Sequence, residues 1–73
     1  MFNYSKLRGK IREVFHTERD FAKEMGFSKQ TLSAKLNGKI EFTQSEIAKA
    51  TSLLEIPQES IPDIFFNAKV KHP

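Results

Sequence analysis

One short stretch of the chain, from Ser28 to Gly38, has side chains suited to contacting the edges of DNA bases. Four of them fall on one face of a predicted helix, and no Asp or Glu occurs in the stretch. A Lys donates hydrogen bonds to guanine or phosphate, a Gln can pair with adenine through two bonds, and short side chains let a helix lie deep in a major groove about 12 Å wide. The predicted base contacts are Lys29, Gln30, Ser33 and Ala34.

Two predicted helices must position this face. The first begins after Thr17, whose side chain can accept a backbone N–H while Asp20 reaches back toward the cap. Its apolar face follows the helical spacing, with Phe21, Ala22 and Met25. A glycine then ends the helix at about Met25, because Gly adopts the left-handed conformation without steric cost.

The second helix begins only two residues after that glycine. Ser28 is its predicted N-cap, Leu32 and Leu36 form its apolar stripe, and Asn37-Gly38 closes it. Because the connection is so short, the two helices cannot lie antiparallel and must cross steeply. Ala22 would lie where they touch, since a small residue permits close approach.

These residues resemble the helix-turn-helix of the lambda-repressor-like family, which includes small phage repressors and Cro-type proteins. The resemblance is carried by Ala22 four residues before Gly26, and by a capped helix that ends in Leu-Asn-Gly. It covers 17–38 well and the whole chain more loosely, as a compact all-α domain of five helices. It implies that the second helix reads bases in double-stranded DNA and that Asn37 contacts a phosphate.

Two residues depart from the pattern of that family. Glu18 stands where these repressors commonly have a phosphate-binding Gln. Lys35 stands where many members have an apolar residue. The first departure puts one backbone contact in doubt.

Unpaired N–H groups and the helix dipole make helix N-termini attractive to phosphate. Thr43 with Glu46 forms a predicted capping box for a helix over 43–54, so Thr43 either only caps this helix or also contacts the backbone. The predicted phosphate contacts are Thr17, Ser28, Asn37, Lys39, Thr43 and Gln44.

The remaining helices flank this unit. The spacing predicts a helix over 4–15, with Leu7, Ile11, Val14 and Phe15 buried. Gly9 interrupts it at a cost of about 1 kcal/mol, which indicates close packing by a neighbouring helix. Its basic residues Lys6, Lys10 and Arg12 form either a solvated face or phosphate contacts.

Beyond residue 54, Pro57 suits the first turn of a last short helix, and Pro62 interrupts that helix or begins a second one.

The end of the chain carries more apolar surface than a terminus needs. One or two of its residues must close the core. The others either form a homodimer interface, as is common for the last helix of related regulators, or serve core closure alone. The interface candidates are Ile61, Ile64, Phe65 and Phe66. Residues 67–73 form a polar tail, either disordered or extended against a partner, so the predicted division is a helix-turn-helix domain over 1–66 and a tail over 67–73.

Composition limits the classes of function. A chain of 73 residues allows one domain and little room for a catalytic pocket. The absence of Cys excludes disulfides and thiolate metal sites, and His16 and His72 are too far apart to suggest a ligand cluster. No apolar run approaches the roughly 20 residues of a membrane span. We therefore expect a cytoplasmic protein with no metal, cofactor or small-molecule substrate.

The distribution of charge favours a DNA partner. Residues 1–39 hold nine Lys or Arg against four Asp or Glu, whereas 40–68 hold one against five. The basic half carries the helix-turn-helix, as a DNA-facing surface requires. Together with this charge distribution, the resemblance to the lambda-repressor-like family implies a dimeric transcriptional repressor of phage type that binds a near-palindromic operator.

A second hypothesis is a protein-interaction module on the same scaffold, which uses the apolar segment 64–66. An enzyme is poorly supported, because Glu24, Glu46 and His16 show no nucleophile-base spacing.

Overall fold

The computed structural model describes residues 3–66, which form helices and connecting turns without a strand. The expected all-α fold with five α-helices is confirmed, with one short 3-10 helix added before the last. The elements are α1 Ser5–Phe15, α2 Glu18–Met25, α3 Lys29–Leu36, α4 Gln44–Leu53, η1 Gln58–Ser60 and α5 Ile61–Phe65. The predicted polar tail over 67–73 lies outside the described residues.

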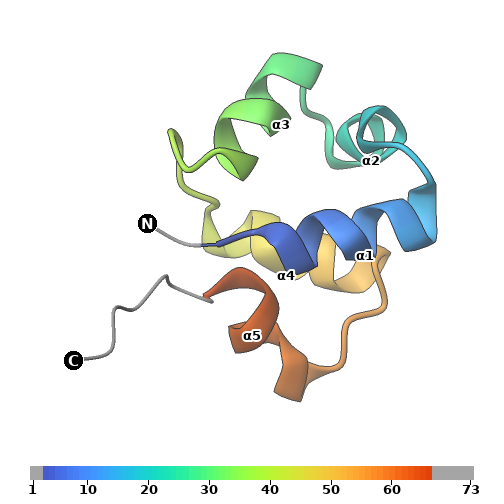
Figure 1. Ribbon diagram of the computed structural model, residues 1–73, viewed down its shortest axis with the longest axis vertical. Coiled ribbons are helices and arrows are strands. Elements are labelled where there is room, and N and C mark those ends of the chain that lie inside the picture. The colour runs from blue at the N-terminus through green and yellow to red at the C-terminus, as the bar shows by residue number, and fades with distance from the viewer. Residues whose placement is uncertain (1–2, 67–73) are drawn as a thin grey trace.

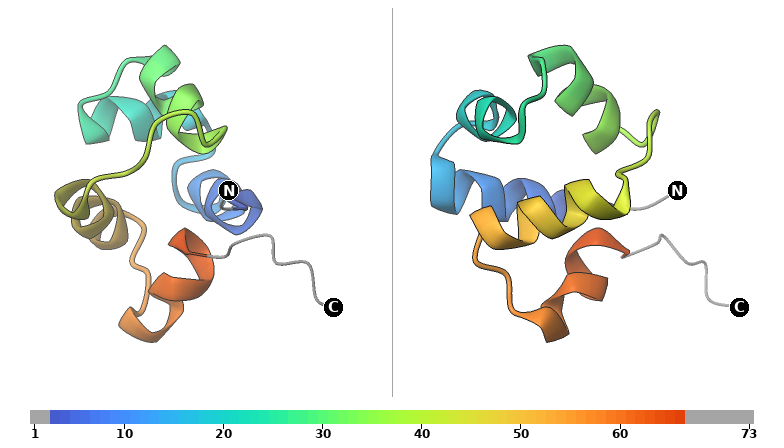
Figure 2. Two further views of the ribbon diagram at one scale, coloured as in Figure 1. Left: turned by 90° about the vertical axis from the view of Figure 1, so that its left-hand side faces the viewer. Right: turned by 180° about the vertical axis from the view of Figure 1, so that it is seen from behind.

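The helices form three tiers. Figures 1 and 2 show α1 and α4 across the middle of the molecule, α2 and α3 on one side, and α5 on the other. Figure 1 looks nearly along the axis of α2 while α3 runs across the view, so the two helices cross steeply, as predicted. This arrangement leaves one side of α3 at the surface.

The turn between α2 and α3 follows from its local sequence. The Thr17 side chain accepts the Asp20 backbone N–H at 3.1 Å, and the Ser28 side chain accepts that of Thr31 at 3.1 Å. Gly26 ends α2 in the left-handed conformation with φ of 81°, where a side chain would be strained. Within residues 3–66 the return bond from the Asp20 carboxylate to the cap does not form, so only half of the predicted exchange at Thr17 is present.

The capping box at the start of α4 is complete. The Thr43 side chain accepts the Glu46 backbone N–H at 3.2 Å, and the Glu46 carboxylate accepts the Thr43 backbone N–H at 2.9 Å. Pro62 begins a second helix, which is one of the two outcomes expected for it, because it lies in the first turn of α5 after η1 has ended.

A single core joins all three tiers. Phe42, from the loop before α4, packs edge-on against Tyr4 at 5.4 Å and against Phe65 at 5.8 Å between ring centroids. The buried apolar residues are Tyr4, Leu7, Ile11, Phe21, Ala22, Met25, Leu32, Leu36, Ala50, Leu54, Ile56 and Phe65. The predicted stripes of α1, α2 and α3 therefore point inward, although Val14 and Phe15 are half-buried at the edge of the core.

Gly9 does not have the expected role. It is exposed, and a Cβ atom built on it would meet nothing within 4 Å. Close packing by a neighbouring helix is thus not the reason for this glycine, and nothing else in the structure explains it.

Candidate nucleic-acid interface

The outward side of α3 forms a shallow groove, which we call the α3 groove. Its volume is about 460 Å³. All four predicted base contacts and two of the predicted phosphate contacts line it together: Lys29, Gln30, Ser33, Ala34, Asn37 and Lys39. The fold therefore gathers onto one surface the residues that the sequence selected separately.

The side chains of the α3 groove are available to a ligand. Lys29, Gln30 and Lys39 are exposed, and within residues 3–66 none of their side chains makes a hydrogen bond or ion pair. No carboxylate lines the groove, so its two ammonium groups set its charge. Such a surface attracts an anion and offers donors to it.

The other predicted phosphate contacts lie outside the α3 groove. Thr17 lines a neighbouring hollow of about 600 Å³, which Lys29 also borders. Ser28 and Thr43 are exposed caps whose hydroxyls already accept backbone N–H groups. Gln44 lines a third hollow, described below. The capping roles are confirmed, while phosphate contact at these four positions stays a prediction.

Asn37 and Glu18 are connected by one arginine. Arg8, on α1, donates from Nη1 to Glu18 Oε2 at 3.1 Å and from Nη2 to Asn37 Oδ1 at 2.9 Å. Asn37 Nδ2 in turn donates to Ser33 Oγ at 3.4 Å. The Glu18 carboxylate is therefore paired with a cation from another helix.

Lys35 faces the interior, away from the α3 groove, although it belongs to the same helix. It is 5% exposed, and its ammonium donates to Glu46 Oε1 at 2.9 Å and to the Glu41 carbonyl at 3.0 Å. The Phe27 and Phe42 rings lie 5.3 and 5.6 Å from Nζ, close enough for cation–π attraction. Lys35 thus ties α3 to the start of α4.

The surroundings of Glu46 lower the pKa of its carboxyl group. Partial burial favours its protonated form, but the Thr43 backbone bond, the Lys35 hydrogen bond and charge, and the Thr43 hydroxyl together outweigh burial and lower its pKa. Glu46 is therefore held as a carboxylate that serves both the cap of α4 and the buried ammonium.

The predicted dimer interface separates into two groups. Phe65 is 1% exposed and packs in the core, so its assignment to an interface is wrong. Phe66 is 49% exposed, and Ile61 and Ile64 are half-buried. Because Phe65 closes the core, three of the four predicted interface residues, Ile61, Ile64 and Phe66, stay candidates for a contact with a second chain.

A further hollow, the α4–α5 groove, has a volume of about 450 Å³. It is more apolar than the α3 groove because isoleucines contribute to its wall. Its lining residues are Gln44, Ile47, Ala48, Thr51, Ile56, Gln58 and Ile61. Sequence reasoning missed this groove, since Ile56 and Ile61 join Ile47 only because the chain folds back after α4.

Two other kinds of site are absent from the described part of the chain. Across residues 3–66, no group of three or more His, Asp or Glu side chains is placed to bind a metal ion. Likewise, none of the helices in this range is long and apolar enough to cross a membrane.

Comparison with known proteins connects this fold to phage regulation. No curated protein matches the sequence. A solved structure, the solution structure of the modulator of repression of the temperate bacteriophage TP901-1 from Lactococcus lactis, matches with 47% identity and a TM-score of 0.79. The match covers 96% of this chain and 95% of that one. A family model matches residues 1–68, so the chain belongs to the family described as protein of unknown function DUF739.

Proposed function

We propose that this protein is a phage-type regulator of transcription that binds double-stranded DNA through the α3 groove. The observation that carries the proposal is the convergence of Lys29, Gln30, Ser33, Ala34, Asn37 and Lys39 on one acid-free surface. The similarity to a phage modulator of repression supports a role in the same kind of regulation.

In the proposed complex, α3 lies in the major groove. Gln30 and Lys29 contact base edges, and Ser33 and Ala34 are small enough to let the helix approach. Asn37, Lys39 and the N-termini of α2, α3 and α4 contact phosphates on either side. The exposed caps at Thr17, Ser28 and Thr43, with Gln44 beside the last, are consistent with this arrangement.

The proposal includes a homodimer on DNA. Two copies would place their α3 helices about 34 Å apart and select a near-palindromic operator. The exposed Phe66, with Ile61 and Ile64, supplies the apolar contact between copies. A dimer bound at a promoter would block polymerase, which makes the protein a repressor.

The test begins with selection of duplexes from a random pool by the purified protein. Recovery of one consensus, with two half-sites about one helical turn apart, supports specific dimeric binding. A pool that shows no enrichment after selection contradicts it.

The Gln30→Ala variant tests base reading. It should bind the selected duplex more weakly by about 1–3 kcal/mol and bind random duplex almost as before, because only base contacts distinguish the two. Titration of both duplexes by fluorescence anisotropy measures this difference. Gln58→Ala is the matched control, since it removes the same side chain outside the α3 groove. An equal loss on both duplexes would show that Gln30 does not read a base.

The Lys39→Ala variant tests phosphate contact. Affinity should fall alike for all sequences, and the slope of log affinity against log salt should decrease by roughly one unit, because one fewer counterion is released. Lys49→Ala, an exposed lysine of α4, is the control and should leave the slope in place. If Lys39→Ala also leaves the slope unchanged, Lys39 does not contact a phosphate.

A second function, binding to another protein, is favoured by the α4–α5 groove, because the proposed DNA complex leaves its isoleucines Ile47 and Ile56 without a role. The name of the similar protein, a modulator of repression, is also consistent with action on another regulator. Weak, salt-insensitive binding to duplex DNA, together with a tight complex with a purified phage repressor, would favour this function over the first.

A further inference from the structure

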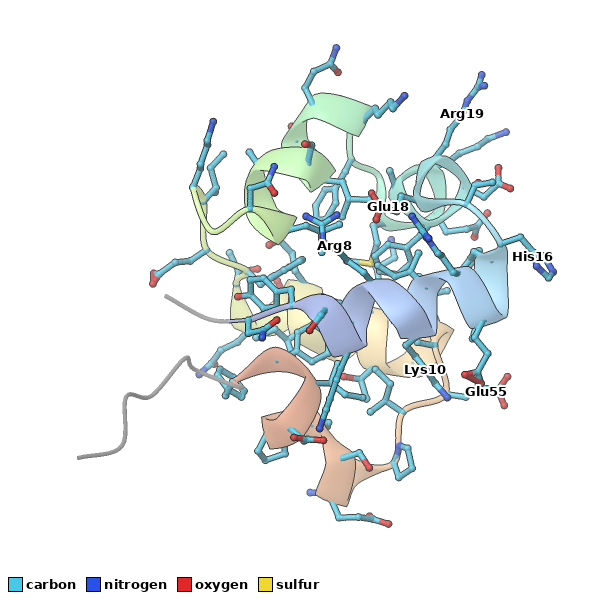
Figure 3. All side chains as sticks on the ribbon, viewed as in Figure 1. Arg8, Lys10, His16, Glu18, Arg19 and Glu55 are labelled. Atoms are coloured by element: carbon cyan, nitrogen blue, oxygen red, sulfur yellow. The ribbon has the colours of Figure 1, made fainter. Side chains whose placement is uncertain are left out.

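Arg8 joins three helices at the edge of the α3 groove. Its guanidinium, which comes from α1, contacts the first residue of α2 and the residue that ends α3. Figure 3 shows the Arg8 side chain pointing from α1 toward α2 and α3, with Glu18 beside it, while Arg19 points away from the molecule. Arg8 is not among the residues that line the groove, but Asn37, which it contacts, is.

This contact fixes which way the Asn37 amide faces. A guanidinium has only donors, so the atom of Asn37 that meets it must be the acceptor oxygen. The amide nitrogen must therefore lie on the other side, where it points toward Ser33. Nδ2 has two hydrogens, and a single bond to Ser33 Oγ uses only one of them. The other is left for an acceptor in the groove.

The same geometry assigns a role to Glu18. A carboxylate at the start of α2 would repel a phosphate, but Arg8 lies 3.1 Å from it and offsets its charge. Glu18 in return holds one nitrogen of the guanidinium, which leaves the second directed at Asn37. A lysine could not replace Arg8 here, because an ammonium is a compact point charge without the planar fork that reaches two partners at fixed positions.

We propose that Arg8 is a positioning residue of the candidate DNA interface, which turns the amide donors of Asn37 toward the α3 groove while Glu18 fixes its guanidinium. The inference rests on the proposed DNA binding for its ligand, a phosphate of the duplex, but the orientation of the amide can be measured without DNA.

The first experiment measures this orientation by NMR in the free protein. The side-chain amide resonances of Asn37, identified by their loss in Asn37→Ala, should shift in Arg8→Lys because the bond to Oδ1 is lost. They should remain in place in Arg12→Lys, the same replacement at an exposed site on the same helix. Unchanged resonances in Arg8→Lys would overturn the proposal, whatever the protein binds.

The second experiment is a double-mutant cycle on the selected duplex. Arg8→Lys should weaken binding about tenfold when Asn37 is present, and less than about threefold in the Asn37→Ala background, because the two residues act as one unit. Asn37 has a φ of −89°, so alanine fits there without strain. Thermal melting of each variant checks that the fold is intact.

Other outcomes distinguish the positioning role of Arg8 from the proposed DNA binding. An equal loss in both backgrounds would mean that Arg8 acts on DNA by itself, and it overturns the positioning role. If the wild-type protein binds no duplex, the proposed function fails and with it the place of Arg8 in a DNA interface. Shifted Asn37 resonances in Arg8→Lys would then still establish that Arg8 orients the amide.

Discussion

Replacement of Glu46 with alanine is expected to destabilise the protein by about 3–5 kcal/mol, because Lys35 would keep its charge in the core without a carboxylate partner. The variant also loses the bond from the carboxylate to the Thr43 backbone N–H. A domain of this length has a total stability of roughly 4–11 kcal/mol, so the loss is a large share of the total and would unfold the protein at the lower end of that range. Urea unfolding followed by circular dichroism measures the loss.

Two further variants show whether the buried charge is the cause. Glu59→Ala removes an exposed carboxylate from η1 and should change stability by less than about 0.5 kcal/mol. The double variant Lys35→Met/Glu46→Ala should recover most of the loss, since replacing both members of a buried pair by apolar groups is often close to neutral. A Glu46→Ala protein as stable as wild type would mean that Lys35 finds another partner or reaches solvent.

The same carboxylate gives the protein a pH dependence. Because the folded protein lowers the pKa of Glu46, its contribution to stability is complete above the ordinary value of about 4.5 and is lost as the pH falls through the lower folded value. The urea midpoint of the wild type should therefore fall more steeply below pH 4.5 than that of Glu46→Gln, which has no proton to gain at this position.

Replacement of Phe65 with alanine is expected to cost about 3–5 kcal/mol, because the ring is fully enclosed and its loss leaves a cavity beside Phe42. Phe66→Ala is the matched control, an identical change at the next residue, where the ring is 49% exposed. Its cost in the monomer should be below about 1 kcal/mol. Thermal and urea unfolding of both variants measure the contrast.

Equal destabilisation by the two variants would show that Phe66 also belongs to the core. If Phe66→Ala were as destabilising as Phe65→Ala, the end of α5 would be held more tightly than its exposure indicates. Sedimentation of Phe66→Ala beside the wild type also tests the proposed dimer, since a self-association constant that does not change would exclude Phe66 from its interface.

Helix caps, a terminating glycine and periodic apolar residues predicted most of the fold. The caps at Ser28 and Thr43 and the glycine that ends α2 lie within three residues of the groups they act on, so the sequence displays both partners together. The periodic stripes likewise indicated which helix faces are buried. Helix geometry alone places Lys29, Gln30, Ser33 and Ala34 on one side of α3, whereas Asn37 and Lys39 join them from the turn that follows the helix.

Contacts between distant residues could not be predicted in this way. Lys35 and Glu46 are 11 residues apart, and Arg8 and Asn37 are 29 apart, so no periodicity connects them. The departures at Glu18 and Lys35 were visible in the sequence, but their partners became known only from the fold. The division between Phe65 and Phe66 depends on the direction in which a five-residue helix ends, which composition does not specify.

The sharing of Glu46 between the cap of α4 and the ammonium of α3 has a consequence for how this protein can diverge. Replacement at position 46 both leaves a buried cation and removes the acceptor of the Thr43 backbone N–H, whereas replacement of Lys35 by an apolar residue leaves Glu46 in place as the cap of α4. We therefore expect this pair to be lost through position 35 first or through both positions together, whereas the exposed residues of α3 can change without affecting it.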